Sequence, residues 1–352
     1  MLSAVRLAVL GAVLALAGPP TRPLPAIATV RIGGRDYVRA TDVAARLGLE
    51  MRWMEPGRVL ELSDPGHRLE FSVGGRTDGR EIIVDGLGVY LGEPAVVRSG
   101  ALYVSKIDWE HRLIPILRPG WGGAPPPRPH VIAIDPGHGG SDPGMQNLRL
   151  GLKEKTFTLD VAFRLKKLLE QDGYKVVMTR VTDRQLAPGK EADLRMRDEL
   201  ANLAHADLFI SIHFNATPPP DVKTHGTEVF TFPAAFQRST DSWSSHLDDA
   251  EQFTSPANRN DDWNVVFAHA MHQELLRSLA TEDRGEKIAH WGVLRALNCP
   301  GILIESAFLT NDAEARRVED PAFRQRIAEA MLAGIRAYSA ELDALSPPAP
   351  PK

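Results

Sequence analysis

The second half of the chain alternates between two hydrophobic patterns. Short β-branched or aliphatic runs are typical of buried strands, and they occur at residues 130–135, 175–178, 207–212 and 301–304. Between these runs apolar residues recur at helical spacing, which predicts helices over residues 158–171, 264–280 and 321–342. Strands that alternate with helices favour an α/β fold, so we expect a mostly parallel open sheet with helices on both faces.

A different pattern precedes this region. Residues 29–118 contain short strand-like runs separated by glycine turns, for example at 59–62, 69–73 and 81–84. Residues 34–47 and 100–113 align as a weak internal repeat, identical at six of fourteen positions. Each copy consists of a turn, a short strand and a helix expected to start at an aspartate cap, Asp42 or Asp108. We therefore expect a small α+β domain ahead of the larger one.

Segments of biased composition divide the chain. Arg6 precedes an apolar run followed by small-residue sites, so residues 1–28 are expected to be a signal peptide that is cleaved on export. The alternatives are an uncleaved anchor and a disordered leader. Residues 119–129, rich in proline and glycine, predict a stiff linker, and residues 343–352 predict a Pro-rich tail. The two predicted domains thus span residues 29–118 and 130–342.

The expected export signal also bears on location. Its apolar run is shorter than the about 20 residues that a spanning helix needs, so we expect no stable membrane span after cleavage. The protein is expected in the periplasm, the cell wall or the extracellular space. A single cysteine, Cys299, forbids an intramolecular disulfide, and its place before an expected buried strand favours a small buried hydrophobe over a nucleophile.

Composition and charge narrow the choice of partners. The chain has 352 residues, of which 43% are apolar and 24% charged, and these values are typical of globular proteins. Its net charge of −4 and the absence of Lys/Arg blocks argue against nucleic acid as a partner.

Polar side chains follow three of the predicted strands. His138 lies three residues past one strand, His213 directly follows another, and Glu305 directly follows a third. Because ligands of open parallel sheets bind at the carboxyl ends of the strands, we expect these side chains to meet there. Two imidazoles and one carboxylate suit a catalytic zinc with one coordination position left open for water. A site that also contains a second acid, Glu154, would have one carboxylate left to move a proton.

The turn around His138 and a second acidic residue extend this hypothesis. Gly139 and Gly140 are expected to let the backbone approach a metal or substrate closely, and Asp135 to hold the His138 ring in one tautomer. Glu154 stands at the expected start of a helix, after a Gly-rich loop that makes a site shared with His138 feasible. The alternative for Glu154 is a solvated residue in the first helical turn, where the helix dipole favours an acid.

Ordered motifs across residues 130–340 resemble one family. They are Asp135-Pro-Gly-His-Gly-Gly with Asp142-Pro-Gly, Lys153-Glu-Lys, Met178-Thr-Arg, Arg197 with Ala201-Asn, Ser211-Ile-His-Phe-Asn-Ala, Asp283-Arg-Gly with Lys287 and Val293-Leu-Arg, and Ile304-Glu with Thr310-Asn. They resemble the zinc-dependent N-acetylmuramoyl-L-alanine amidases of the third amidase family, which remove stem peptides from peptidoglycan. The resemblance implies zinc ligands at His138, Glu154 and His213 and a catalytic glutamate at Glu305. The chain departs from the family pattern at Ser306-Ala-Phe and at Glu286, where an aliphatic residue is usual.

The first domain has a weaker resemblance. Residues 29–118 resemble the copper amine oxidase N-terminal-like domain found in bacterial envelope proteins. The sequence contains no metal cluster there, because His67 and His111 are isolated, so we expect a structural or wall-docking module.

Further polar residues are candidates for substrate binding. Asn147 and Asn215 flank the expected ligands and are candidates for hydrogen bonds to the peptide stem, with turn chemistry as the alternative. Arg284, with Lys287, is a candidate for binding substrate carboxylates, with a solvated pair as the alternative. His269 and His272 share one predicted helix, and we expect them to have packing and surface roles.

A polar, Ser- and Asp-rich segment at residues 233–263 is longer than an ordinary connection. We hypothesise an inhibitory flap in which Glu251 competes for the open metal position, with a surface loop without function as the alternative. A protein activator is a candidate partner beside peptidoglycan. Three functions follow in order of preference: a peptidoglycan amidase, another zinc amidohydrolase or peptidase on the same sheet, and a non-catalytic wall-binding protein.

Overall fold

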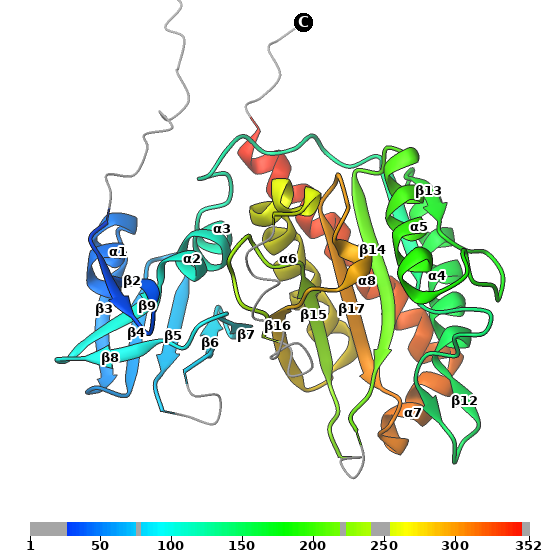
Figure 1. Ribbon diagram of the computed structural model, residues 1–352, viewed down its shortest axis with the longest axis horizontal. Coiled ribbons are helices and arrows are strands. Elements are labelled where there is room, and N and C mark those ends of the chain that lie inside the picture. The colour runs from blue at the N-terminus through cyan, green and yellow to red at the C-terminus, as the bar shows by residue number, and fades with distance from the viewer. Residues whose placement is uncertain (1–26, 75–78, 219–222, 241–253, 347–352) are drawn as a thin grey trace, which may run out of the picture.

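The computed structural model describes residues 27–74, 79–218, 223–240 and 254–346. A small N-terminal module lies beside a larger C-terminal one, and Figure 1 shows them in blue to cyan and in green to red. In the part of the chain that the structure describes, no helix combines the length and the apolar character needed to cross a membrane. The expected signal peptide lies outside these residues except for its last two positions.

The larger module has the expected α/β architecture. Its strands are β10 (Val131–Pro136), β11 (Gln146–Asn147), β12 (Leu152–Lys153), β13 (Lys175–Met178), β14 (Leu208–Asn215), β15 (Thr227–Thr231), β16 (Asp283–Ile288) and β17 (Gly301–Phe308). Its helices are α4 (Glu154–Gln171), α5 (Lys190–Leu203), α6 (Asp261–Leu279), α7 (Asp312–Glu319) and α8 (Pro321–Leu345), with short 3-10 turns at Pro256–Asn260 and Gly292–Leu294. The strand order is β13-β10-β14-β17-β15-β16, parallel except between β17 and β15.

Helices cover both faces of this sheet, as predicted. Ile132 and Ile134 of β10 face the cluster formed with α4, α6 and α8, whereas Ala133 faces the opposite cluster with α5 and the Gly292–Leu294 turn. Side chains alternate between the faces of a strand, so a strand that is apolar at successive positions needs a cover on each side. The continuous apolar runs of the sequence are explained by this double burial.

The small module contains two sheets and short helical segments. Its strands are β1 (Thr29–Ile32), β2 (Arg35–Arg39), β3 (Glu50–Glu55), β4 (Val59–Ser63), β5 (Arg68–Ser72), β6 (Glu81–Val84), β7 (Leu87–Tyr90), β8 (Val96–Arg98) and β9 (Ala101–Ser105). Its helical segments are α1 (Ala40–Leu47), α2 (Lys106–Asp108), a π-helical turn (Trp109–Leu113) and α3 (Ile114–Leu117). One sheet has the order β1-β2-β9-β8, and strands β3 to β7 form an antiparallel meander.

The internal repeat is confirmed as two strand-helix units, β2 with α1 and β9 with α2, but the expected aspartate caps are wrong. Asp42 lies inside the first turn of α1. The cap of α2 is Ser105, whose hydroxyl accepts from the Asp108 backbone N–H. The buried Asp108 carboxylate instead accepts hydrogen bonds from the backbone of Gly92 at 2.9 Å and from the Gln237 side chain at 2.9 Å. The aspartate therefore joins segments that are distant in the chain.

The two modules share one sheet, which the sequence analysis did not predict. Strand β7 pairs in parallel with β16, with Val89 opposite Glu286. Within the described residues the resulting sheet has eleven strands in the order β13-β10-β14-β17-β15-β16-β7-β6-β5-β4-β3. The chain therefore passes through the segment 119–129 between two regions whose backbones are also hydrogen-bonded to each other.

Buried polar residues reinforce this junction. Arg112 of the π-helical turn is buried and donates from Nη1 to Thr231 Oγ1 at 3.1 Å. Glu286 on β16 is fully buried beside His269, with 2.7 Å between Oε1 and Nδ1. Burial by itself raises the pKa of Glu286, but the charges of His269 and Arg112 hold it below its usual range. An acid thus replaces the usual aliphatic residue where a buried arginine of the small module lies nearby.

The histidines on α6 have packing roles, as expected. His272 is fully buried, and its Nε2 lies 2.7 Å from Asp283 Oδ1. The other carboxylate oxygen of Asp283 accepts the Gly88 backbone N–H of β7 at 2.8 Å. This pair therefore also ties α6 and β16 to the small module.

Arg112→Ala should loosen the junction. The substitution removes a buried donor and leaves Glu286 with less compensating charge, so we expect the free energy of unfolding to fall by about 3 kcal/mol. Urea unfolding measures this change, and proteolysis should cut the segment 119–129 faster. Arg98→Ala, at an exposed position of β8, is the matched control and should change neither. An Arg112→Ala protein as stable as the control would contradict the structural role.

Asp198 predicts a pH dependence of stability. This acid on α5 is buried, and burial raises its pKa to about 8, although the Ala296 N–H donates to it at 3.1 Å. Its value in the unfolded chain is about 3.9. Between these two values only the unfolded chain loses the proton, so stability falls as pH rises from about 4 to about 8.

Asp198→Asn keeps the shape of the neutral acid without ionising. The variant should match the wild type at pH about 4 and exceed it at pH about 8 by a few kcal/mol, because one pKa unit corresponds to about 1.4 kcal/mol. Urea unfolding at the two pH values checks this. An equal loss of stability in both proteins would contradict it.

Candidate metal centre

Neighbouring strands bring the predicted site residues together. His138 follows β10, and His213 of β14 is in register with Glu305 of the adjacent parallel strand β17. Both strands run further than predicted, so His213 and Glu305 lie within them rather than directly after them. A register shift between His213 and Asn215 bends β14 at this point. The expected meeting of these side chains at one edge of the parallel sheet is confirmed.

Glu154 is buried at the centre of the cluster. It is the first residue of α4 and is only 1% exposed. Its two carboxylate oxygens lie 3.0 Å from His138 Nε2 and 3.0 Å from His213 Nδ1. They also accept backbone hydrogen bonds from Met145 at 2.7 Å and Phe214 at 3.0 Å. The site shared with His138 is confirmed, and the alternative of a solvated first-turn residue is wrong.

The donors of this cluster suit a transition-metal ion. One atom from each of His138, Glu154 and His213 lies within 4.8 Å of the other two. Neutral imidazole nitrogens and a carboxylate oxygen are ligands that zinc prefers. The planes of the two rings meet at 78°, with centroids 4.9 Å apart, so their nitrogens approach the carboxylate from different directions. The three residues therefore fit a bound metal by the chemistry of their donors.

Two glycines make room for the cluster, but they are not the ones expected. A Cβ on Gly137 would collide with the His213 ring, and one on Gly144 would meet Glu154 Oε2. Gly139 and Gly140 instead face the backbone of residues 184 and 185, on the other side of the turn. Their expected role beside the metal is therefore wrong, because the turn directs them toward the neighbouring loop.

Asp142 orients His138, a role that the sequence analysis assigned to Asp135. Asp142 Oδ2 lies 2.8 Å from His138 Nδ1, which leaves Nε2 facing Glu154. The hydrogen bond to His138 lowers the pKa of Asp142 to about 2. Burial alone would lower the pKa of His138, but its bonds to Asp142 and Glu154 raise it to about 9. Burial alone would raise the pKa of Glu154, yet the two histidines hold it far below its usual range.

Asp135 supports the backbone of the His138 turn instead. Its carboxylate accepts from Ser211 at 2.7 Å, from Thr179 at 2.6 Å and from Arg197 at 2.8 Å. Arg197 also donates to the His138 carbonyl at 2.9 Å, and Arg180 to the Gly137 carbonyl at 2.9 Å. His138 itself has a left-handed backbone with φ of 62°. Two buried guanidinium groups thus hold a strained turn, which is how such conformations persist.

A further buried carboxylate beside the site, Glu228, was not predicted from the sequence. It lies on β15 opposite Glu305 and is 3% exposed. Asn215 Nδ2, Arg284 Nε and Lys287 Nζ all donate to it, at 3.0, 2.7 and 2.8 Å. Arg284 and Lys287 are therefore not a simply solvated pair. An acid inside the otherwise β-branched and aromatic strand Thr227–Thr231 was the signal in the sequence.

Asn147 lies beside the site, but its amide is already engaged. Nδ2 donates to the Leu309 carbonyl at 3.0 Å and to Asp312 at 2.8 Å, and Oδ1 accepts from the Leu150 N–H at 3.0 Å. These bonds tie the β11–β12 hairpin to the turn after β17. The structure thus supports the turn role, and contact with a substrate stays a prediction.

The structure tests the prediction for Cys299 but not the one for the flap. Cys299 is buried and burial raises the pKa of its thiol to about 12, so it has no thiolate at neutral pH and the expected inert role is confirmed. Of the proposed flap at residues 233–263, residues 241–253, Glu251 included, lie outside the described residues. The inhibitory flap therefore stays a hypothesis.

Comparison with known proteins relates this site to bacterial wall amidases. An uncharacterized cell wall amidase of Bacillus anthracis is 34% identical over 211 residues, which are 59% of this chain and 35% of that protein. The germination-specific N-acetylmuramoyl-L-alanine amidase of Bacillus subtilis is 34% identical over 221 residues, or 60% of this chain and 80% of that protein. This chain therefore spans about a third of one relative and four fifths of the other.

A solved structure and a family model match the same region. The CwlD amidase of Clostridioides difficile, solved in complex with the GerS lipoprotein, is 26% identical with a TM-score of 0.49, and the match covers 60% of this chain and 99% of that one. The model of the third amidase family (Amidase_3), described as N-acetylmuramoyl-L-alanine amidase, matches residues 132–337. Because this match includes more than half of the chain and the cluster of His138, Glu154 and His213, the protein belongs to the Amidase_3 family.

Proposed function

We propose that the protein is a zinc-dependent N-acetylmuramoyl-L-alanine amidase that hydrolyses the bond between muramic acid and the first alanine of peptidoglycan stems. The main support for this proposal is the cluster of His138, Glu154 and His213 beside Glu305. This arrangement provides three metal ligands of the kind found in catalytic zinc sites and a separate carboxylate. Family membership supports the same substrate.

Zinc would be held by His138, Glu154 and His213. When bound there, zinc lowers the pKa of a water ligand toward about 7 and polarises the substrate carbonyl. Asp142 keeps His138 Nδ1 hydrogen-bonded, so that Nε2 stays directed at the site. The buried Glu154 remains ionised between the two imidazoles. These residues thus supply a prearranged set of ligands.

Glu305 is the proposed general base. It is in register with His213 on the neighbouring strand, and strands in a sheet lie about 4.8 Å apart. Glu305 would take a proton from the attacking water and return it to the departing alanine nitrogen. The nitrogen then leaves as a neutral amine instead of an amide anion. A carboxylate held at this distance by two strands needs little reorganisation to reach both atoms.

Arg284, Asn215 and Asn147 are the proposed substrate-binding residues. Arg284 uses Nε for Glu228, and among the described residues its terminal nitrogens donate no hydrogen bond. A guanidinium with free terminal N–H groups binds a carboxylate with two hydrogen bonds. The stem peptide carries such carboxylates, so of the three residues Arg284 is the one best suited to bind the substrate. Asn215 and Asn147 border the same site.

The setting of this activity is part of the proposal. Residues 1–28 would direct export to the periplasm, the cell wall or the medium, where the substrate lies. A protein activator is proposed as a further partner, and residues 29–118 are proposed to be a copper amine oxidase N-terminal-like module.

Digestion of purified peptidoglycan tests the activity. The mature protein with zinc should release stem peptides that begin with a free alanine, detected by mass spectrometry, and a chelator should stop the release until zinc is restored. Cleavage inside the peptide would instead indicate another amidohydrolase or peptidase. Binding without release would indicate a non-catalytic wall protein. Activity that resists chelation but is blocked by a thiol reagent would favour Cys299.

Substitutions separate the two roles at the site. Glu305→Gln should keep the bound zinc, measured by elemental analysis, and lower kcat by about 10²- to 10⁴-fold, as expected for the loss of a general base. His138→Ala should lose both zinc and activity. His130→Ala, an exposed histidine before β10, is the control and should change neither. Normal turnover by Glu305→Gln would overturn the assigned role.

A further inference from the structure

A polar row crosses the shared sheet from the metal centre into the small module. His213, Glu305 and Glu228 occupy paired positions on β14, β17 and β15. On β16, Lys287 pairs with Phe230 of β15, and Tyr90 of β7 pairs with Glu81 of β6. Because Val89 and Glu286 pair and face α6, the following residues, Tyr90 and Lys287, both face the opposite side. The catalytic and N-terminal modules thus contribute to one face.

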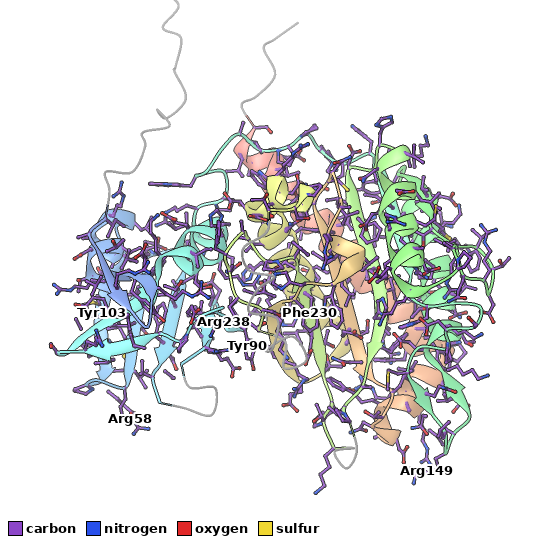
Figure 2. The ribbon with its side chains drawn as sticks, viewed as in Figure 1. Arg58, Tyr90, Tyr103, Arg149, Phe230 and Arg238 are labelled. Atoms are coloured by element: carbon purple, nitrogen blue, oxygen red, sulfur yellow. The ribbon has the colours of Figure 1, made fainter. Side chains whose placement is uncertain are left out.

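Close contacts join this row at the boundary between the modules. Lys287 Nζ lies 5.1 Å from the centroid of the Tyr90 ring and 6.0 Å from that of Phe230. Figure 2 shows Tyr90 and Phe230 near the centre of the molecule, with Tyr103 far out in the small module. A Cβ on Gly285 would lie 2.6 Å from the Tyr90 ring, so this ring packs directly on β16. Tyr90 of the small module therefore packs directly against the larger module.

The groups at this end of the row are chemically mixed. Lys287 bridges Glu228 and the Tyr90 ring, and the Tyr90 side chain hydrogen-bonds with Glu81. An ammonium group, an aromatic ring and a carboxylate therefore lie side by side; Tyr90 is partly exposed, and the Lys287 side chain keeps 13% of its surface exposed. Such a set suits a ligand that bears both a carboxylate and an amine, with the ring covering its apolar stem.

The distance from the scissile bond fits a particular part of the substrate. Strand β7 is three strands from β17, and a spacing of about 4.8 Å places Tyr90 roughly 14 Å from Glu305. An extended peptide advances about 3.3 to 3.6 Å per residue, so about four residues span this distance. With its first residue at Glu305, an extended stem places its third residue about 7 Å along this path, and a long side chain on that residue covers the remaining distance to Tyr90.

We propose that the small module completes the substrate site, and that Tyr90, with Lys287 and Glu81, binds the diamino acid at the third position of the stem peptide. This inference rests on the proposed amidase function. Lys287 binds a carboxylate of the stem, Glu81 binds the side-chain amine, and the Tyr90 ring packs on the methylene chain between them. The N-terminal module then determines which stem lengths are cleaved efficiently.

The test compares a long and a short substrate with the zinc-loaded full chain. An N-acetylmuramoyl tripeptide ending in a diamino acid reaches Tyr90, whereas N-acetylmuramoyl-L-alanyl-D-isoglutamine does not. Tyr90→Ala should raise KM for the tripeptide by about tenfold, as expected when the packing of the ring on the methylene chain is lost, with kcat unchanged. Its KM for the dipeptide should stay the same.

Matched variants separate binding from folding. Glu81→Gln keeps the packing of the sheet and should lower the preference for a third-position diamino acid over alanine. Tyr103→Ala is the control, because this tyrosine of β9 lies in the other sheet, bonded to Arg39, and its loss should leave the ratio between the two substrates unchanged. Thermal unfolding of each variant identifies any general destabilisation, which would affect both substrates alike.

The outcomes distinguish the two proposals. Wild-type protein that cleaves neither substrate would overturn the amidase function itself. Wild-type protein that cleaves both with equal kcat/KM, or Tyr90→Ala and Glu81→Gln proteins with the wild-type ratio between substrates, would overturn only the role of the small module.

Discussion

The buried carboxylate of Glu154 is the group on which the site depends. A charge at 1% exposure is costly unless it is fully paired, and here two imidazoles and two backbone N–H groups surround it at the positive end of α4. Those partners come from the His138 turn, from β14 and from the hairpin before α4. Satisfying one carboxylate therefore brings three separate segments to one point, where His138, Glu154 and His213 form a group that could hold a metal ion.

The turn that carries His138 is held from behind by charge as well. Arg180 and Arg197 donate to its carbonyl groups, and Asp135 compensates the buried Arg197. A left-handed backbone at His138 costs free energy, and these fixed donors offset that cost before any ligand arrives. The His138 imidazole is thus positioned by the fold itself, which is the preorganisation that the proposed metal site needs.

The shared sheet fixes the N-terminal module to the larger one. A module joined only by a flexible linker would move independently, but pairing of β7 with β16 fixes its orientation. Arg112 donates to Thr231 across the junction, and its charge helps to hold the pKa of the buried Glu286 below its usual range. The same pairing brings Tyr90 of β7 onto the face of the sheet that carries Lys287 and Glu228, so the proposed recognition of the stem depends on this junction as well.

The sequence by itself determined the α/β fold, because runs such as 207–212 bury both faces, and it predicted that His138, His213 and Glu305 lie close together because each follows a strand-like run. The ordered motifs added Glu154. Only the tertiary structure decided that Asp142 and not Asp135 orients His138. It also decided that Glu228 accepts hydrogen bonds from Asn215 and Arg284, and that Val89 pairs with Glu286. Periodicity reports which side of an element is buried, whereas the partner of a buried charge or of a strand edge is chosen by packing between segments far apart in the chain.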